Sequence, residues 1–183
     1  MPVEVNPQTF TMVEYDAGRI ASFAQDLASR VGLPKDHVIQ LEIDERTPLA
    51  RVDTVSLDPL RITIESGALE NPKRIRQLSD ERMADVLGIA FLQALDRLDP
   101  AFGGPPVDER PSLPHTVAWD AYATARMERL GLPSQRRRRQ YHFRNRHGFT
   151  DRADDAFDRI WSAERLTWAE LTRLSDEAAA AAA

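Results

Sequence analysis

The hydrophobic pattern between Ser79 and Leu98 predicts one long helix that is buried on several sides. Apolar residues recur at three- and four-residue spacing through this stretch, which places them on one helical face. Two further apolar residues, Ile89 and Leu92, lie off that face. Ser79 is a suitable N-cap, and the acidic residues after it favour the positive end of the helix dipole. We therefore expect the sheet and the other helices to pack around this helix.

Alternation of apolar and polar positions predicts a small sheet before the central helix. Four segments are expected to form its strands: 8–14, 38–44, 51–56 and 60–65. A helix capped by Asp16 should follow the first of them and end at Gly32, where a left-handed residue can close it. The pattern thus predicts three or four strands, antiparallel or mixed, packed on the central helix.

The chain after the central helix predicts a loop and then helices only. Residues 99–114 contain five prolines and two glycines, which is typical of an ordered loop. Four helices should follow, at 115–130, at 134–147 with Ser134 as its cap, from Thr150, and from a capping box at Thr167 and Glu170. We predict one α+β domain over 1–183, with the sheet and central helix in 1–98 and a helical region in 115–183.

The composition is that of a globular protein. The 183 residues are 42% hydrophobic and 29% charged. No apolar run reaches the ~20 residues that a membrane-spanning helix needs, and no signal peptide is visible. The absence of cysteine excludes disulfides and thiolate metal sites and fits a reducing compartment. We expect a cytoplasmic protein with no membrane partner.

The charge is unevenly distributed. The net charge is −5, yet six arginines lie in the segment 134–150, which contains no acidic residue; the rest of the chain therefore carries 18 − 29 = −11. Arginines with interleaved rings are typical of phosphate or nucleic-acid binding. The candidate binding residues are Arg136, Arg137, Arg138, Arg139, Tyr141, His142, Arg144, Arg146 and His147.

The same arginines have a second, intramolecular interpretation. Four aspartates follow them with spacings of three and four residues: Asp151, Asp154, Asp155 and Asp158. This spacing forms one acidic helical face, and a turn at Gly148 could fold it back onto the arginines. Four consecutive arginines also point around the whole helix, at about 100° each, so they do not form a one-sided groove. We favour internal pairing or a solvated helical face over a nucleic-acid surface, because the protein as a whole is acidic.

Three common catalytic and nucleotide-binding motifs are absent from the sequence. The chain has no Gly-x-Ser-x-Gly elbow, no Walker A sequence and no Gly-x-Gly-x-x-Gly. The four histidines include no pair at i and i+4, so we expect no metal and no cofactor. An unrecognised hydrolase remains an alternative, with its acid and base drawn from Asp85, His142, His147 or Asp151. The competing interpretation of Asp85 is a structural pair with Arg82 or with one of the arginines in 134–146.

The order of elements in residues 16–98 resembles a known family. A helix ending in Gly32-Leu33-Pro34, the strands Val-Ile-Gln-Leu-Glu-Ile and Arg-Ile-Thr-Ile-Glu, and a long buried helix together resemble the minimal zincin-like metallopeptidases. In that family the buried helix carries H-E-x-x-H, which binds zinc and supplies the base. Here the corresponding residues, 85–92, read Asp-Val-Leu-Gly-Ile-Ala-Phe-Leu. The resemblance implies the fold without the activity.

The function predicted from the sequence is therefore a non-catalytic binding or scaffold domain on a degenerate zincin-like fold. Its expected surface is the cleft where such a peptidase binds substrate, bordered by the loop 99–114 and the basic segment. The partner would be a protein or a phosphate-containing ligand. Phosphate or nucleic-acid binding through 136–147 is the first alternative, and the unrecognised hydrolase is the second.

Overall fold

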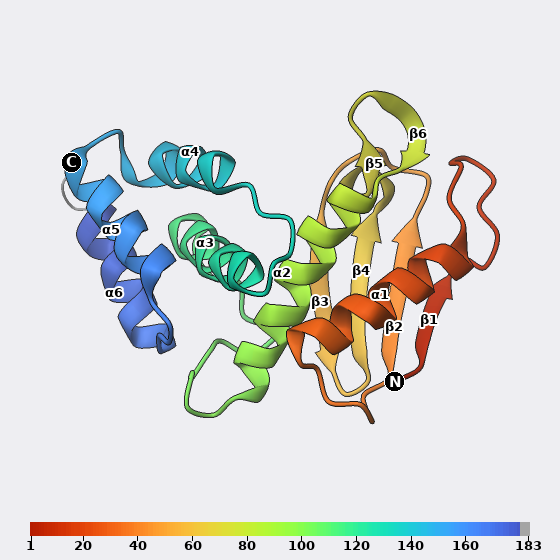
Figure 1. Ribbon diagram of the computed structural model, residues 1–183, viewed down its shortest axis with the longest axis horizontal. Helices are drawn as coiled ribbons and strands as arrows, with labels where there is room; N and C mark the ends of the chain where they lie inside the picture. Colours follow the sequence, from red (N-terminus) through yellow and green to blue (C-terminus); the bar gives the residue numbers. More distant parts are fainter. Residues whose placement is uncertain (180–183) are drawn as a thin grey trace. The chain divides into compact units, whose positions relative to one another are not determined.

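The computed structural model describes residues 1–179 (Figure 1). The chain forms two compact units, Met1–Ala94 (unit 1) and Leu95–Ala183 (unit 2). The predicted α+β class is confirmed, because a mixed sheet with helices packed against it is followed by helices only. The single-domain organisation stays a prediction.

Unit 1 is built on a four-stranded sheet in the order β1-β2-β4-β3. The strands are β1 (Val3–Asn6), β2 (Ile39–Asp44), β3 (Val52–Leu57) and β4 (Leu60–Glu65). β2 pairs in parallel with both β1 and β4, and β3 is an antiparallel edge strand against β4. The predicted strands at 38–44, 51–56 and 60–65 are confirmed to within a residue or two.

The strand predicted within 8–14 is wrong, because the fourth strand lies earlier, at β1. The segment after β1 has side chains that suit a strand, but its backbone N–H groups are used elsewhere. The carboxylate of Glu45 accepts from the N–H groups of Thr11 at 2.8 Å and of Met12 at 2.7 Å. The parallel partner of β2 is instead the short Val-Glu-Val-Asn sequence, where only Val5 is buried.

Two helices, α1 (Ala17–Val31) and α2 (Asp80–Leu98), cover one face of this sheet (Figure 1). Asp16 caps α1 by accepting from the N–H of Arg19 at 2.7 Å, and Gly32 ends it with a φ of 90°, as predicted. β2 and β4 alternate buried and half-buried residues along their whole lengths. Phe91 and Leu87 of α2 are fully buried. The central helix predicted from the apolar pattern is therefore confirmed, except that Leu98 at its end is exposed.

A hairpin that the hydrophobic pattern did not predict lies between η1 (Ser66–Ala68) and α2. Its strands are β5 (Glu70–Asn71) and β6 (Arg74–Leu78), which pair antiparallel. The segment is rich in charged residues and has no alternating apolar positions, so it lacks the sequence signal of a strand. Two of its own side chains support it by accepting from backbone N–H groups: Glu70 from Arg76, and Asn71 from Lys73.

Unit 2 consists of the end of α2 and four further helices: α3 (Leu113–Arg129), α4 (Arg136–His147), α5 (Asp151–Ser162) and α6 (Trp168–Ala179). The caps at Thr150 and at the Thr167–Glu170 box are confirmed. The Ser134 cap is wrong: Gln135 is the N-cap residue of α4, and the Ser134 hydroxyl donates to Glu128 instead. Within the described residues, no helix is long and apolar enough to cross a membrane.

Candidate functional site

The basic helix α4 is attached to unit 2 by very few apolar residues. Only Phe143 and His147, one turn apart, are buried, and their rings stack with centroids 3.8 Å apart. Phe143 also meets Phe157 of α5 edge-on at 5.7 Å. A helix that buries so little apolar surface needs other contacts to hold it in place.

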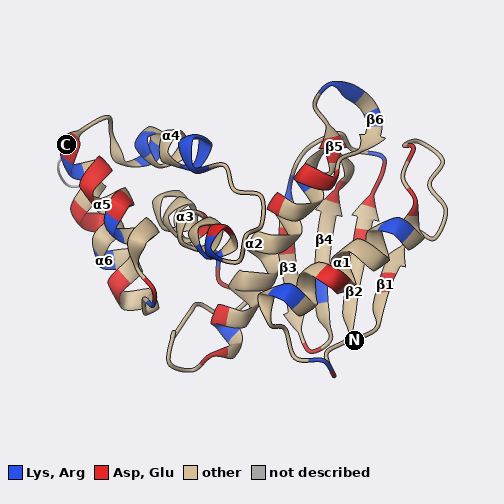
Figure 2. Ribbon diagram, viewed as in Figure 1, with Lys and Arg blue, Asp and Glu red and all other residues tan. Residues whose placement is uncertain are grey.

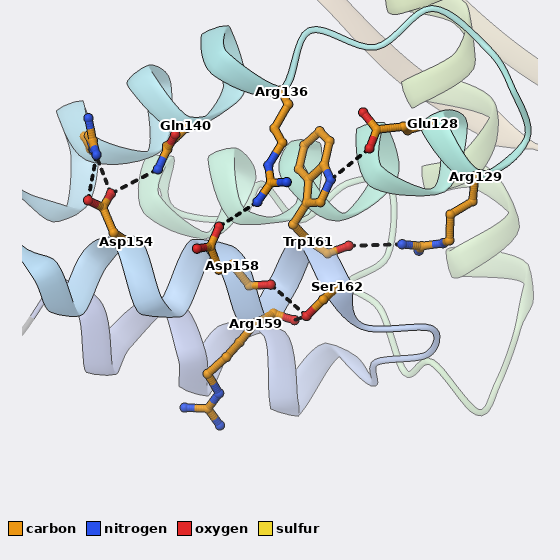
Figure 3. Close-up of polar contacts among 10 residues, drawn as sticks. Glu128, Arg129, Arg136, Gln140, Asp154, Asp158, Arg159, Trp161 and Ser162 are labelled. Carbon is orange, nitrogen blue, oxygen red and sulfur yellow. Dashed lines mark hydrogen bonds and ion pairs between the residues drawn. The ribbon is translucent and has the colours of Figure 1, made fainter.

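Ion pairs to α5 supply part of that attachment (Figure 3). Arg136 donates to Asp158 at 2.8 Å, and Arg144 makes a two-pronged contact with Asp154 at 2.7 and 2.6 Å. Gln140 donates to the same Asp154 carboxylate at 3.3 Å. The hydrogen bonds from Arg144 lower the pKa of Asp154 below its ordinary value. The predicted internal pairing is therefore confirmed for Asp154 and Asp158.

Two further arginine contacts lie on the inner side of α4. The guanidinium of Arg139 lies 3.6 Å from Asp120 of α3, and its side chain is only 11% exposed. The guanidinium of Arg136 also lies over the ring of Trp161, 5.4 Å from its centroid. The Trp161 N–H in turn donates to Glu128 at 3.3 Å (Figure 3). Helix α4 is thus held against both α3 and α5 by arginine.

The solvent-exposed surface of α4 carries charged and aromatic side chains together. Arg137, Arg138, Tyr141 and Arg146 are exposed there, and Phe149 lies beyond the helix end. The Tyr141 and Phe149 side chains are 58% and 66% exposed, and their rings meet edge-on at 6.1 Å. We call this surface the outer face of α4; it also includes His142, whose ring is 6.4 Å from that of Tyr141.

The structure therefore divides the predicted binding residues into two sets. The inward set, defined by a partner on α3, α5 or α6, comprises Arg136, Arg139, Arg144 and His147; the Arg136 side chain is nevertheless 49% exposed. The outward set comprises Arg137, Arg138, Tyr141, His142 and Arg146. Helix geometry alone does not give this division, because Arg137 and Arg144 are seven residues apart, as are Arg139 and Arg146, and each pair lies on nearly the same side of α4. The division follows instead from which arginines reach an aspartate on α3 or α5. Phe149, outside the predicted set, joins the outward residues through its ring contact with Tyr141.

The positive charge of α4 is compensated within its own unit. Unit 2 contains 14 arginines and 14 acidic residues, so its net charge is zero. The whole charge of −5 belongs to unit 1, which has ten basic and 15 acidic residues. Figure 2 shows the acidic helix α5 beside the basic helix α4. The outer face of α4 is therefore a local positive patch on a neutral unit.

His147 forms a buried hydrogen-bonded pair with Ser175 of α6. Its Nδ1 lies 2.9 Å from the carbonyl oxygen of Phe143, which can only accept, so Nδ1 carries the proton. Its Nε2 then accepts from the Ser175 hydroxyl at 2.7 Å. Serine and histidine at this distance resemble a nucleophile and its base, but both side chains are fully buried. No substrate reaches them, and the pair links α4 to α6.

This burial gives a testable titration. Burial lowers the pKa of His147 below its ordinary value of about 6.5, although the bond to Phe143 opposes the change. The folded state favours the neutral imidazole, so the unfolded state takes up a proton more readily. Protonation of His147 should therefore lower the free energy of unfolding as the pH falls below about 6.5. We expect the His147 ring signals in NMR to titrate below that value. His147→Gln assigns the signals and should flatten the pH dependence of Tm; a His147 pKa above about 6.5 would contradict the burial.

The residues of the hydrolase alternative lie in separate surroundings. Asp85 is buried in unit 1, with its carboxylate 3.9 Å from Arg82, as the structural interpretation predicted. Within unit 2, His142 and His147 lie on different sides of α4, and Asp151 is exposed at the start of α5. His142 and His147, on different sides of one helix, are not placed to exchange a proton with each other.

A buried carboxylate that we did not predict, Asp96, is the centre of a polar cluster in unit 2. It accepts from the Trp119 N–H at 2.7 Å and from the guanidinium of Arg126. Arg97 covers the Trp119 ring at 4.5 Å and donates to the carbonyl of Pro105 at 3.2 Å. Burial raises the pKa of Asp96, and the charge of Arg126 opposes this. The sequence did contain a signal for the burial of Asp96. It follows Asp85 by eleven residues, which places the two carboxylates on nearly the same side of the helix.

Unit 1 has a pocket of about 560 Å³ at the carboxyl ends of β1, β2 and β4. Its lining includes five carboxylates, from Glu42, Asp44, Glu45, Asp53 and Glu65. Each carboxylate has a partner within the unit. Glu42, Asp44 and Asp53 pair with the guanidinium groups of Arg61, Arg46 and Arg51 in that order. Glu45 accepts from the backbone N–H groups of residues 11 and 12, and Glu65 accepts from the N–H of Arg51. Within the described residues, no group of three His, Cys, Asp or Glu side chains is arranged to hold a metal ion. We place no ligand in this pocket.

No protein family, curated protein or solved structure matches this chain. The resemblance to zincin-like metallopeptidases therefore stays a prediction.

Proposed function

We propose that this protein is a non-catalytic binding domain, and that the outer face of α4 binds an acidic segment of a protein partner. The observation that carries the proposal is the division of the arginines. Arg136, Arg139 and Arg144 hold the fold together, whereas Arg137 and Arg146 extend into solvent beside two exposed rings. Arg137, Tyr141 and Arg146 of the outer face are exposed and therefore available to a partner, and we assign recognition to them.

The composition of this face favours a protein partner. Arginine and tyrosine are enriched among the residues that contribute most to protein–protein binding, because each combines apolar surface with hydrogen-bond donors. Tyr141 and Phe149 together offer apolar surface for an aliphatic or aromatic side chain of the partner. Arginines around this apolar centre fit carboxylates on either side of that side chain.

A nucleic-acid partner fits the same face less well. Proteins that bind nucleic acid through phosphates commonly make six to ten such contacts, and the outer face offers three arginines. The neutral charge of unit 2 also removes the long-range attraction that steers nucleic acids toward basic proteins. Phosphate or nucleic-acid binding remains the second outcome of the test below.

The proposal does not depend on the zincin-like resemblance. It differs from the sequence-based prediction in the position of the surface. The cleft bordered by the loop 99–114 and the basic segment stays a prediction, whereas the outer face of α4 is defined by exposed residues. A non-catalytic function is supported by the complete burial of the Ser175–His147 pair.

The test uses two fluorescent probes, a glutamate–tyrosine copolymer peptide and a single-stranded oligothymidine. We expect the wild-type protein to bind the copolymer and to bind oligothymidine more weakly. The outer double variant, Arg137→Gln with Arg146→Gln, should lose about tenfold or more in copolymer affinity, since two charge-assisted contacts disappear. Its Tm should be unchanged or slightly higher, because like charges on one helix have been removed.

The matched control is the inner double variant, Arg136→Gln with Arg144→Gln. It removes the same charge from the same helix, but it breaks the contacts to Asp158 and Asp154, so Tm should fall while copolymer affinity changes little. Equal loss of affinity in both variants would indicate a nonspecific charge effect and overturn the proposal. Tighter binding of oligothymidine with a steep salt dependence would replace it with the nucleic-acid function.

A further inference from the structure

The β5–β6 hairpin of unit 1 exposes a basic tip with one large apolar side chain at its centre. Residues 72–76, Pro-Lys-Arg-Ile-Arg, are all exposed. The Ile75 side chain is 83% exposed, more than any other large apolar side chain in the described part of the chain. The hairpin projects from the sheet in Figure 1, and its tip is basic in Figure 2. Three cations therefore surround one isoleucine on a convex surface.

A bulge in β6 produces this exposure. Glu70 pairs with Leu78, and the next residue, Asn71, already pairs with Arg74, so residues 75–77 have no partner in the ladder. Bulges redirect the side chains that they contain, and here they turn Ile75 away from the sheet. Arg76 has a φ of 65°, which is unusual for a residue with a side chain.

The strained conformation is held from both sides. The N–H of Arg76 donates to the carboxylate of Glu70, and the carbonyl of Arg76 accepts from the N–H of Glu14 at 2.8 Å. The turn itself is closed by a hydrogen bond from the Lys73 N–H to the Asn71 side chain at 2.9 Å. The tip is thus a built feature that presents Ile75, and not a frayed loop.

From this arrangement we infer that the hairpin tip binds the surface of an anionic lipid membrane. A convex tip needs no matching groove if its target is a fluid layer, into which Ile75 can insert. Lys73, Arg74 and Arg76 lie around it, where they can contact lipid phosphates and keep their charges in water. Peripheral contact of this kind needs no spanning helix, and it departs from the sequence-based expectation of no membrane partner.

The binding is expected to be weak and local. Each cation near an anionic surface contributes about a fivefold gain in affinity, so the three together contribute about a hundredfold. The remaining charge of unit 1 is negative and opposes approach, but it is screened beyond about 8 Å at physiological ionic strength. Because the hairpin tip projects from the unit, it can contact the membrane while the acidic residues of unit 1 remain farther away.

The experiment measures co-sedimentation with vesicles of phosphatidylcholine, with and without phosphatidylserine, at physiological salt. We expect the full chain to bind the phosphatidylserine vesicles only. Ile75→Ser should reduce binding severalfold, and the double variant Lys73→Ser with Arg74→Ser about 25-fold. The matched controls in the same unit are Leu49→Ser, an exposed apolar residue, and Lys35→Ser, an exposed cation.

The controls should bind as the wild type does, and all variants should keep the wild-type Tm, because none of these side chains is buried. Wild-type protein that fails to bind phosphatidylserine vesicles would overturn the inference. Equal losses in the tip variants and the controls would also overturn it, since the effect would then belong to the overall charge of the unit.

Discussion

Replacing Asp96 with alanine should lower the free energy of unfolding by about 3 kcal/mol. The substitution leaves the guanidinium of Arg126 without its buried anion and the Trp119 N–H without an acceptor. Breaking a buried ion pair costs about 3–5 kcal/mol, and we expect the lower end because the Arg126 side chain is still 21% exposed to water. Urea denaturation with tryptophan fluorescence measures the loss.

Two companion variants show that the loss comes from this cluster. Asp96→Asn keeps an acceptor oxygen, so one hydrogen bond can be retained although the charge disappears. This variant should therefore lose less free energy of unfolding than Asp96→Ala. Asp108→Ala removes an exposed carboxylate of the same unit and should change stability by no more than about 0.5 kcal/mol. An Asp96→Ala variant as stable as Asp108→Ala would mean that water, and not Asp96, satisfies Arg126 and Trp119.

Phe91→Ala should cost about 3–5 kcal/mol, the usual loss when a buried phenylalanine leaves a cavity. Phe91 is fully buried on α2, one turn from the fully buried Leu87, on the helix that covers the sheet of unit 1. A loss of this size is a large part of the about 5–15 kcal/mol that stabilises a typical protein. Thermal and urea unfolding followed by circular dichroism would detect it.

The control lies at the end of the same helix. Leu98 is 37% exposed, so Leu98→Ala should cost well under half as much, because little apolar surface is returned to water. If Phe91→Ala cost less than about 1 kcal/mol, the helix could not be the centre of the hydrophobic core, and the central-helix interpretation of 79–98 would fail.

The candidate site was only half predictable. The run of arginines and the acidic face at Asp154 and Asp158 were visible in the sequence, and so was their pairing. Which arginines pair could not be deduced, because that depends on the rotation of α4 about its axis. Phe143 and His147 decide that rotation by packing inward, and their burial leaves Arg137 and Arg146 in solvent.

Hydrophobic periodicity by itself determined the long elements of this protein. The helix 80–98, the strands at β2 and β4, and the caps at Asp16, Thr150 and Thr167 all follow from local patterns that each segment carries within itself. These signals are reliable because burial on one face imposes a period on the chain wherever the element lies in the fold.

Tertiary structure alone decided the features without such a period. β1 forms because β2 offers an edge for parallel pairing. Residues 11 and 12, which follow β1, are held by the distant carboxylate of Glu45. The β5–β6 hairpin and the Asp96 cluster likewise depend on partners far away in the sequence or on backbone groups that leave no pattern in it. Strand pairing and hydrogen bonds between residues far apart in the sequence arise only in the folded chain. A local sequence pattern therefore cannot predict them.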